Sequence, residues 1–330
     1  MFYIIYLTRT EVVNAMNQKV NLMEEIRQQA LDLFKLDVSD MQKISKGWRT
    51  SKWKLITNDG EFFFVKCYPL EHFPVSELKH VHYSLRIQSK LNHFGIPCPK
   101  PYKYNESYIH LTQSGFPFTI MEYSKGKTMN EKEITGDQLY DLGKVIGSMH
   151  AFFSQLHSRK LQWYPSKRDL LSNLISQKFK SKLSSDKVNS ELPRIRKIID
   201  EIDMSVFYQC KQGWTHWDLW SGNVLFGSKK VTSILDFDRL KYVFPALDVV
   251  RPILSFTLSK NGELNKELAQ SLIKGYREYA FINISELTKA FRLLLLQETP
   301  WWLTYSERFY NELSWILLNW YELEYHLDFI

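Results

Sequence analysis

The chain has 330 residues, of which 44% are hydrophobic and 24% charged, with a formal net charge of +7. This composition is typical of a globular protein with a large core, and it excludes a disordered or fibrous chain. Its three cysteines lie far apart, which excludes a disulfide framework and a cysteine zinc site and favours a reducing, cytoplasmic setting (Cys67, Cys98 and Cys210).

The excess positive charge lies mainly in 178–187 and 194–197, stretches that are typical of solvated helices. No aromatic residues alternate with these basic residues to stack on bases, so we expect no nucleic-acid partner. The apolar opening, residues 1–7, is too short to cross a bilayer and no membrane partner is expected. We treat 1–17 as a possible extension.

The first predicted elements are a helix and a β-hairpin. Apolar positions recur with helical period over 18–36, which predicts an amphipathic helix. Residues 53–57 and 62–66 read as two strands around a turn at 58–60. Lys66 ends the second strand, where a long cationic side chain on a rigid element could reach a phosphate. The alternative is a lysine kept for solubility on an edge strand.

Three further elements follow in the first half of the chain. A helix is predicted over 75–92, and the proline-rich segment 95–101 connects it to the next strands. Residues 116–123 read as a strand that leaves the first lobe. A long helix is predicted over 139–155, where Gly143 and Gly147 allow close packing.

The segment 216–223, with the sequence His-Trp-Asp-Leu-Trp-Ser-Gly-Asn, carries the strongest functional signal. Its H-x-D-x-x-x-x-N spacing is that of a kinase catalytic loop, in which Asp218 would accept a hydroxyl proton. Asn223 and the later Asp236 offer the oxygen ligands that Mg²⁺ prefers. Short apolar runs around a turn at 227–230 predict a hairpin with Asn223 and Asp236 at its two ends. The alternative is a loop whose polar side chains cap turns.

The end of the chain is acidic and aromatic, against the basic background of the rest. Aromatic faces and carboxylates together suit an amine-bearing acceptor, through cation–π and ion-pair contacts. We expect some of four residues to line the acceptor pocket: Glu298, Trp301, Trp302 and Tyr305. The alternative for most of this segment is a packed helical core with a solvated acidic face.

On these motifs the chain resembles the aminoglycoside phosphotransferase, choline kinase and homoserine kinase superfamily. The superfamily pattern is H-G-D-x-x-x-x-N, then I-D-F/W, then a later Asp. Here Trp217 replaces the glycine, and Asp248 matches the later Asp. The resemblance runs from about Lys46 to the C-terminal helices. It implies an α+β, two-lobed protein-kinase-like fold, with a small β-rich N-lobe, a larger mainly helical C-lobe, and ATP and Mg²⁺ in the cleft.

The resemblance also implies where the nucleotide is held. Lys66 would grip the α- and β-phosphates, and Thr50 and Ser51 belong to a glycine-poor loop that could cover them. The backbones of Glu122 and Tyr123 would contact adenine. The implied limits are an N-terminal nucleotide lobe over 1–121, a hinge over 122–127 and a catalytic and acceptor lobe over 128–330.

The resemblance implies an acid on the helix over 75–92 to orient Lys66. No acid lies about two turns before Leu91, where it is expected; Ser84 and Arg86 stand near that position. Glu77 is the only acid of this helix, and it could equally be a first-turn residue favoured by the helix dipole.

Supporting roles follow for the other polar residues near the motif. His150 and His216 would fix geometry, and Asp248 would brace the catalytic loop. Asp238 could reach a second metal or the substrate, or pair with a nearby arginine, either Arg239 or Arg251.

The implied function is ATP-dependent phosphorylation of a hydroxyl on a small, amine-bearing molecule, either an antibiotic or a metabolite such as homoserine or an amino alcohol. A protein kinase is disfavoured, because no A-P-E segment follows Asp236 and D-F-D replaces D-F-G. The other alternative is a catalytically inactive relative that serves as a binding or spore-coat-like structural protein.

Overall fold

The computed structural model describes residues 9–45, 49–180, 186–304 and 306–328. Contacts divide the chain into two compact units. The N-terminal unit comprises 1–93 and 98–124, and the C-terminal unit comprises 94–97 and 125–330. Each unit has its own strands and helices.

The N-terminal unit is built on one antiparallel five-stranded sheet in the order β1-β2-β3-β5-β4. Its strands are β1 (Val38–Ile44), β2 (Ser51–Thr57), β3 (Phe62–Cys67), β4 (His110–Leu111) and β5 (Pro117–Glu122). Two helices belong to it, α1 (Arg9–Phe34) and α2 (Val75–Phe94).

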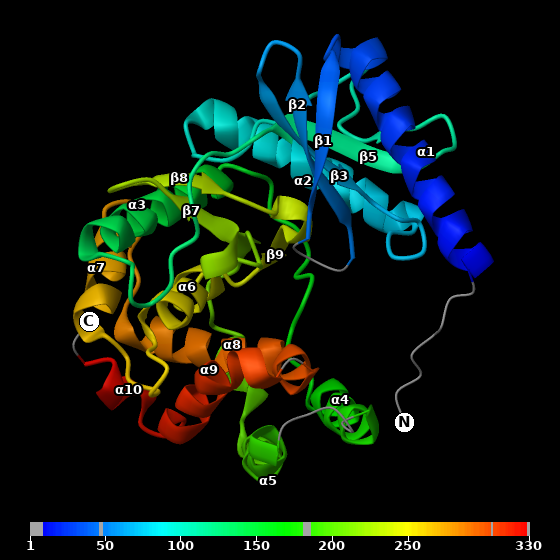
Figure 1. Ribbon diagram of the computed structural model, residues 1–330. Helices are drawn as coiled ribbons and strands as arrows, with labels where there is room; N and C mark the ends of the chain where they lie inside the picture. The colour runs from blue at the N-terminus through cyan, green and yellow to red at the C-terminus, as the bar shows by residue number, and fades with distance from the viewer. Residues whose placement is uncertain (1–8, 46–48, 181–185, 305, 329–330) are drawn as a thin grey trace. The chain divides into compact units, whose positions relative to one another are not determined.

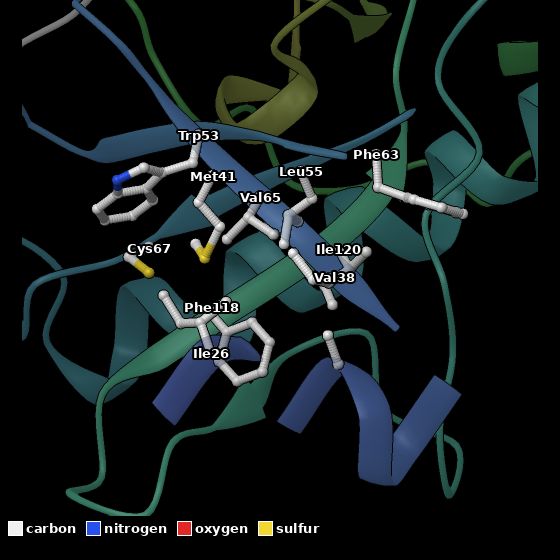
Figure 2. Close-up of a cluster of buried hydrophobic side chains, with 11 residues drawn as sticks. Ile26, Val38, Met41, Trp53, Leu55, Phe63, Val65, Cys67, Phe118 and Ile120 are labelled. Atoms are coloured by element: carbon white, nitrogen blue, oxygen red, sulfur yellow. The ribbon is translucent and has the colours of Figure 1, made fainter. Parts of the chain in front are cut away.

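The predicted hairpin is confirmed as β2 and β3, which pair from Ser51 opposite Cys67 to Ile56 opposite Phe62. Gly60 has φ +86°, a left-handed conformation that glycine adopts without strain, and it closes the turn. Side chains alternate between the two faces of a strand. Figure 2 shows Val65 and Cys67 of β3 in the buried cluster with Ile26 of α1.

The opposite face of the sheet packs on α2. Tyr68 and Met121 form a second buried cluster with Val81 and Leu85 of α2, and Phe64 packs against it. The two helices therefore cover opposite faces of the sheet (Figure 1). Lys66 lies two residues after Phe64 and two before Tyr68, and residues two apart on a strand share one face of the sheet. The side chain of Lys66 therefore lies on the α2 face.

The C-terminal unit is mainly helical. Its longer helices are α3 (Gly136–Phe153), α4 (Lys167–Lys180), α5 (Asp186–Glu201), α6 (Leu247–Thr257), α7 (Lys266–Tyr276), α8 (Ile284–Thr304) and α9 (Ser306–Asn319). Short helices are η1 (Met204–Phe207), η2 (Ser221–Asn223), η3 (Phe237–Arg239) and α10 (Leu323–His326). Two antiparallel pairs complete it, β6 (Gly213–Thr215) with β9 (Lys241–Val243), and β7 (Val224–Phe226) with β8 (Val231–Ile234).

Glycines bring α3 and α7 into close contact. A Cβ atom at Gly143 would lie 2.0 Å from the carbonyl oxygen of Leu272, and one at Gly275 would lie 2.0 Å from that of Tyr140. Only glycine permits such an approach of two backbones. The expectation that Gly143 allows close packing is confirmed, and the contact fixes α3 beside the helix that ends at Tyr276.

The predicted fold class is confirmed: the chain has a protein-kinase-like fold with a β-rich N-terminal part and a helical C-terminal part. The predicted helix over 139–155 is α3, and the predicted strand over 116–123 is β5. None of the helices in the described ranges has the length and apolarity needed to cross a membrane.

Candidate active site

The β7–β8 hairpin brings Asn223 and Asp236 together. Val224 pairs with Ile234, and the backbone N–H of Leu235 donates to the carbonyl oxygen of Asn223 at 2.8 Å. Asn223 thus precedes one strand and Asp236 closely follows the other, as the sequence predicts. Asp236 has φ +66° and ψ +58°, a left-handed conformation that is uncommon for a residue other than glycine.

Asn223 is tied to Asp218 by its amide nitrogen. Asn223 Nδ2 donates to the backbone oxygen of Asp218 at 2.8 Å and to its carboxylate Oδ2 at 3.2 Å. An amide that donates through nitrogen keeps its oxygen for another partner. Asn223 Oδ1 and the carboxylate of Asp236 are therefore a donor set that suits a hard divalent cation. No cluster of three or more His, Cys, Asp or Glu ligands occurs within the described ranges.

Arg239 is a neighbour of Asp218 that the sequence analysis did not assign to it. Its Nη1 lies 3.2 Å from Asp218 Oδ1, so the two carboxylate oxygens of Asp218 face different donors. Arg239 belongs to η3, directly after the Asp-Phe-Asp segment. In the sequence, only its position beside Asp238 could hint at the contact with Asp218, and that position does not single out one partner among several acids.

His216 links the catalytic loop to the start of the D-F-D segment. Its Nε2 lies 2.9 Å from the carbonyl oxygen of Leu235, and its Nδ1 accepts the backbone N–H of Asp218 at 3.3 Å. A carbonyl can only accept and an N–H can only donate, so these contacts require the tautomer with hydrogen on Nε2. The ring is completely buried and lies edge-on to Phe237 at 4.6 Å. His216 fixes geometry in this structure, as the sequence analysis expects.

Asp248, at the start of α6, holds the same loop from the other side. Its carboxylate accepts the backbone N–H of His216 at 2.6 Å and that of Trp217 at 3.0 Å. His150 of α3 donates to it at 3.2 Å and contacts the Tyr276 hydroxyl at 3.1 Å through its other nitrogen. Burial, together with the Asp248 carboxylate, raises the pKa of Tyr276 well above its ordinary value. The expected bracing role of Asp248 is confirmed.

Trp217 occupies the position where the superfamily pattern has glycine. Its φ is +68°, which is strained for a bulky residue. The indole ring packs edge-on against Trp163 at 5.2 Å, and the Lys241 ammonium lies 5.1 Å from its centroid. The hydrogen bonds to Asp248 and this packing offset the strain, so the loop keeps the glycine-like backbone without glycine.

A small pocket lies beside Asp218, with a volume of about 10 Å³, room for roughly one water molecule. Its charged and polar lining comes from Asp218, Asp248, Arg251, Gln297 and Glu298. Burial raises the pKa of Glu298, Arg251 lowers it, and the nearby carboxylate of Asp218 raises it further. Glu298 thus lines a small pocket together with Asp218, and its role in acceptor binding stays a prediction.

Arg251, which lines this pocket, is buried and forms an ion pair with Glu312 of α9. Burial acts to lower the pKa of Arg251, but Glu312 and Glu298 outweigh it and keep the pKa raised. Glu298 of α8 and Glu312 of α9 thus both interact with the buried guanidinium of Arg251.

The candidate nucleotide residues lie in the N-terminal unit. Lys66 is buried, with 4% of its surface exposed, while Thr50 and Ser51 are half-buried at the start of β2. The backbone N–H of Glu122 donates to Lys100 and that of Tyr123 to Phe62. An adenine contact at these two residues would therefore have to use their carbonyl oxygens.

Glu77 forms an ion pair with Arg49, whose Nη2 lies 2.9 Å from its carboxylate. Arg49 also donates to the backbone oxygen of His72 at 2.8 Å and lies over the ring of Phe73. Both charged side chains of the ion pair are partly exposed. Glu77 thus ties the start of α2 to the loop that precedes β2.

Several predicted site residues are described only in part or lie outside the described ranges. Tyr305 and residues 46–48 of the phosphate-covering loop lie outside the described residues, as do the side chains of Trp301 and Trp302 in α8. Asp238 is half-buried in η3.

Comparisons with known proteins agree on one class. The model of the phosphotransferase enzyme family matches residues 40–282. Two curated relatives are homoserine kinases, from Sinorhizobium fredii (23% identical, 64% of this chain) and from Rhizobium meliloti (23% identical, 58% of this chain). The matches span 65% and 57% of those relatives' lengths, less than two thirds in each case.

Solved structures share the fold. An amicoumacin kinase in complex with AMP-PNP, Ca²⁺ and Ami superposes with a TM-score of 0.66 at 16% identity, covering 96% of each chain. A spectinomycin phosphotransferase in complex with ADP and spectinomycin gives a TM-score of 0.57 at 14% identity, covering 93% of this chain and 98% of that one. At these identities the likeness is one of fold.

The kinase-like fold and the family match define the class, a phosphotransferase. The chain belongs to the phosphotransferase enzyme family.

Proposed function

We propose that this kinase transfers the γ-phosphate of ATP to a hydroxyl of a small acceptor that also carries an amine. The observation that carries the proposal is the arrangement around Asp218. Asn223 donates to the Asp218 carboxylate, and Asn223 and Asp236 flank the two strands of one hairpin. Hydrogen bonds of His216 to the backbone of Leu235 and of Asp248 to the backbone of His216 hold the loop of Asp218.

Asp218 is proposed to orient the acceptor hydroxyl and to accept its proton. The hydroxyl oxygen forms a bond to the γ-phosphorus while the bond from that phosphorus to the β,γ-bridging oxygen breaks. ADP then leaves with the electron pair, and the proton resides on Asp218. In a loose transition state most of the rate enhancement comes from positioning, which Arg239 and Asn223 would supply by fixing both carboxylate oxygens.

Asn223 and Asp236 are proposed to hold Mg²⁺, which would neutralise the charge of the phosphates when bound. In the N-terminal unit, Lys66 would bind the α- and β-phosphates. Thr50 and Ser51 would contact phosphate, and the carbonyl groups of Glu122 and Tyr123 would face adenine. Structural neighbours captured with AMP-PNP or ADP support a nucleotide in this fold.

The acceptor is proposed to place its ammonium group at Glu298. Glu298 lines the same small pocket as Asp218, so an ammonium group at Glu298 would lie near the proposed base, with the rest of the acceptor outside this pocket. Trp301, Trp302 and Tyr305 follow Glu298 in the chain and complete the proposed acceptor surface, and Asp238 is a further candidate contact. Homoserine and spectinomycin, named for the relatives and for one neighbour, fit this description, and with aminoglycosides and amino alcohols they form the test panel.

The test is phosphate transfer from Mg²⁺-ATP to that panel, followed by ADP release and mass spectrometry of the product. Wild-type protein should phosphorylate at least one compound, and Asp218→Asn should lose that turnover while it still binds ATP. Asp328→Asn, a change at an exposed acid, is the matched control and should keep full activity. Turnover that survives Asp218→Asn would overturn the role of Asp218.

A further inference from the structure

Two buried hydroxyl groups of the N-terminal unit lack hydrogen-bond partners. Ser84 on α2 and Thr119 on β5 are both completely buried. Within the part of the chain that the structure describes, neither Ser84 Oγ nor Thr119 Oγ1 has a partner. Nearly all buried polar groups in native proteins are hydrogen-bonded, so an exception calls for an explanation.

Thr119 lies directly opposite Lys66. The two residues form a cross-strand pair in the register of β3 and β5. Side chains paired in this way point to the same face of the sheet, with Cβ atoms about 4.5–5.5 Å apart. The Lys66 ammonium is itself located near this face, 5.7 Å from the centroid of the Tyr68 ring.

Ser84 approaches the same place from the helix. Its neighbours Val81 and Leu85 pack with Tyr68 and Met121. One turn further along α2, Gln88 Nε2 lies 3.9 Å from Met121 Sδ. Residues three and four apart share one face of a helix, so Ser84 faces the sheet between these two contacts.

On this face of the sheet Phe64 pairs with Met121, and the next pair is Lys66 with Thr119. Tyr68 follows Lys66 by two residues, so the Lys66–Thr119 pair lies between Met121 and Tyr68. Ser84, Thr119 and Lys66 therefore converge between α2 and the sheet.

We propose that Ser84 and Thr119 are positioning residues for Lys66, and that their hydroxyl oxygens accept hydrogen bonds from its ammonium when nucleotide binds. The inference rests on the proposed function, in which Lys66 binds the phosphates of ATP. Ser84 stands near the helix position where the superfamily resemblance implies an acid, and Glu77 is engaged with Arg49.

The chemistry of the two kinds of partner differs. An ammonium group has three donors, and a hydroxyl group offers lone pairs without negative charge. A carboxylate would orient the lysine and also neutralise it. Two hydroxyls orient it and leave its whole charge for the phosphates.

The test is a double-mutant cycle on the Kd for Mg²⁺-ATP, which requires no knowledge of the acceptor. Ser84→Ala and Thr119→Val are each made in the wild type and in Lys66→Met. In the wild type each change should weaken binding by about three- to tenfold, the range of one hydrogen bond. In Lys66→Met the same changes should have no further effect. An equal weakening in both backgrounds would overturn the inference.

Matched variants separate the hydroxyl from packing. Thr119→Ser keeps the hydroxyl and should bind ATP as the wild type does, whereas Thr119→Val keeps the shape and should not. Wild-type ATP binding by Thr119→Val together with weakened binding by Thr119→Ser would show that packing alone matters and would overturn the inference. Ser76→Ala, on the exposed first turn of α2, is the control for Ser84→Ala. An unchanged Kd in Lys66→Met would instead contradict the proposed role of Lys66 itself, and the inference with it.

Discussion

The carboxylate of Asp248 accepts the backbone N–H of Trp217 at 3.0 Å, so an acid on α6 holds the residue directly before Asp218. The same carboxylate accepts the N–H of His216. We expect Asp248→Asn to lower the free energy of unfolding by about 1–3 kcal/mol, since the amide nitrogen that replaces one carboxylate oxygen cannot accept a backbone N–H. Turnover should fall by more than the loss of folded protein explains.

Chemical denaturation and initial rates on the same preparation would measure both effects of Asp248→Asn. Asp169→Asn, at the exposed first turn of α4, is the control. Wild-type rates in a destabilised Asp248→Asn protein would show that the brace serves folding alone.

Removal of the Arg239 guanidinium should slow turnover with little change in ATP affinity. In Arg239→Gln, Asp218 loses the donor at Oδ1 and can rotate away from the acceptor hydroxyl. Misplacement of a catalytic group by about 1 Å can reduce a rate by roughly a hundredfold. We therefore expect kcat to fall about ten- to hundredfold, which steady-state kinetics at saturating ATP would measure. Arg196→Gln, on the exposed face of α5, should leave kcat unchanged, and an equal fall there would contradict this interpretation.

Glu298 should make both stability and acceptor binding depend on pH. Its pKa is raised by burial, so the folded protein favours the protonated carboxyl. Stability linked to this group is complete below the ordinary glutamate pKa of about 4.3 and is lost as pH rises through the raised pKa. Wild-type protein should therefore lose stability over this range more steeply than Glu298→Gln, which stays neutral.

Acceptor binding should have the opposite pH dependence, because the ionised carboxylate attracts an ammonium group. The KM for acceptor should fall as pH rises through the pKa of Glu298 in the wild type and should stay flat in Glu298→Gln. Glu263→Gln, at an exposed acid, is the control. Matching pH profiles in the wild type and Glu298→Gln would exclude an ionic role for this residue.

The contact between α3 and α7 should tolerate no side chain at Gly143. The added methyl group of Gly143→Ala would overlap the backbone oxygen of Leu272, which cannot move without the helix. We expect a loss of about 3 kcal/mol or more, measured by thermal or denaturant unfolding. The methyl group added by Gly136→Ala would lie 3.2 Å from Ser271 Oγ, the end of a short side chain that can shift, and this change should be nearly neutral.

Local patterns predicted most of what lies at the candidate site. The β2–β3 and β7–β8 hairpins follow from apolar runs around short turns, and the second of these places Asn223 and Asp236. The strand β1 was not predicted. Its sequence, Val-Ser-Asp-Met-Gln-Lys-Ile, lacks strict alternation, because a register shift between Val38 and Asp40 interrupts the pairing with β2.

Partners chosen by tertiary structure could not be predicted in the same way. Arg239 had several acids within reach in the sequence, and only the fold directs it to Asp218. Glu77 had two interpretations, and the ion pair with Arg49 depends on a residue far away in the chain. Asp248 was predicted correctly because the superfamily pattern places an acid there, although its His150 contact joins residues 98 positions apart.

The brace at Asp248 also has a consequence for synthesis of the protein. Asp218 precedes α6 and α7 in the chain, yet its loop is held through Asp248 of α6 and, beyond His150, through Tyr276 of α7. A nascent chain that has emerged only as far as Asp236 therefore contains both proposed metal ligands but not the later groups that hold the loop of Asp218. Phosphate transfer would begin only after these later helices have folded, so a truncated product would carry the motif without the activity.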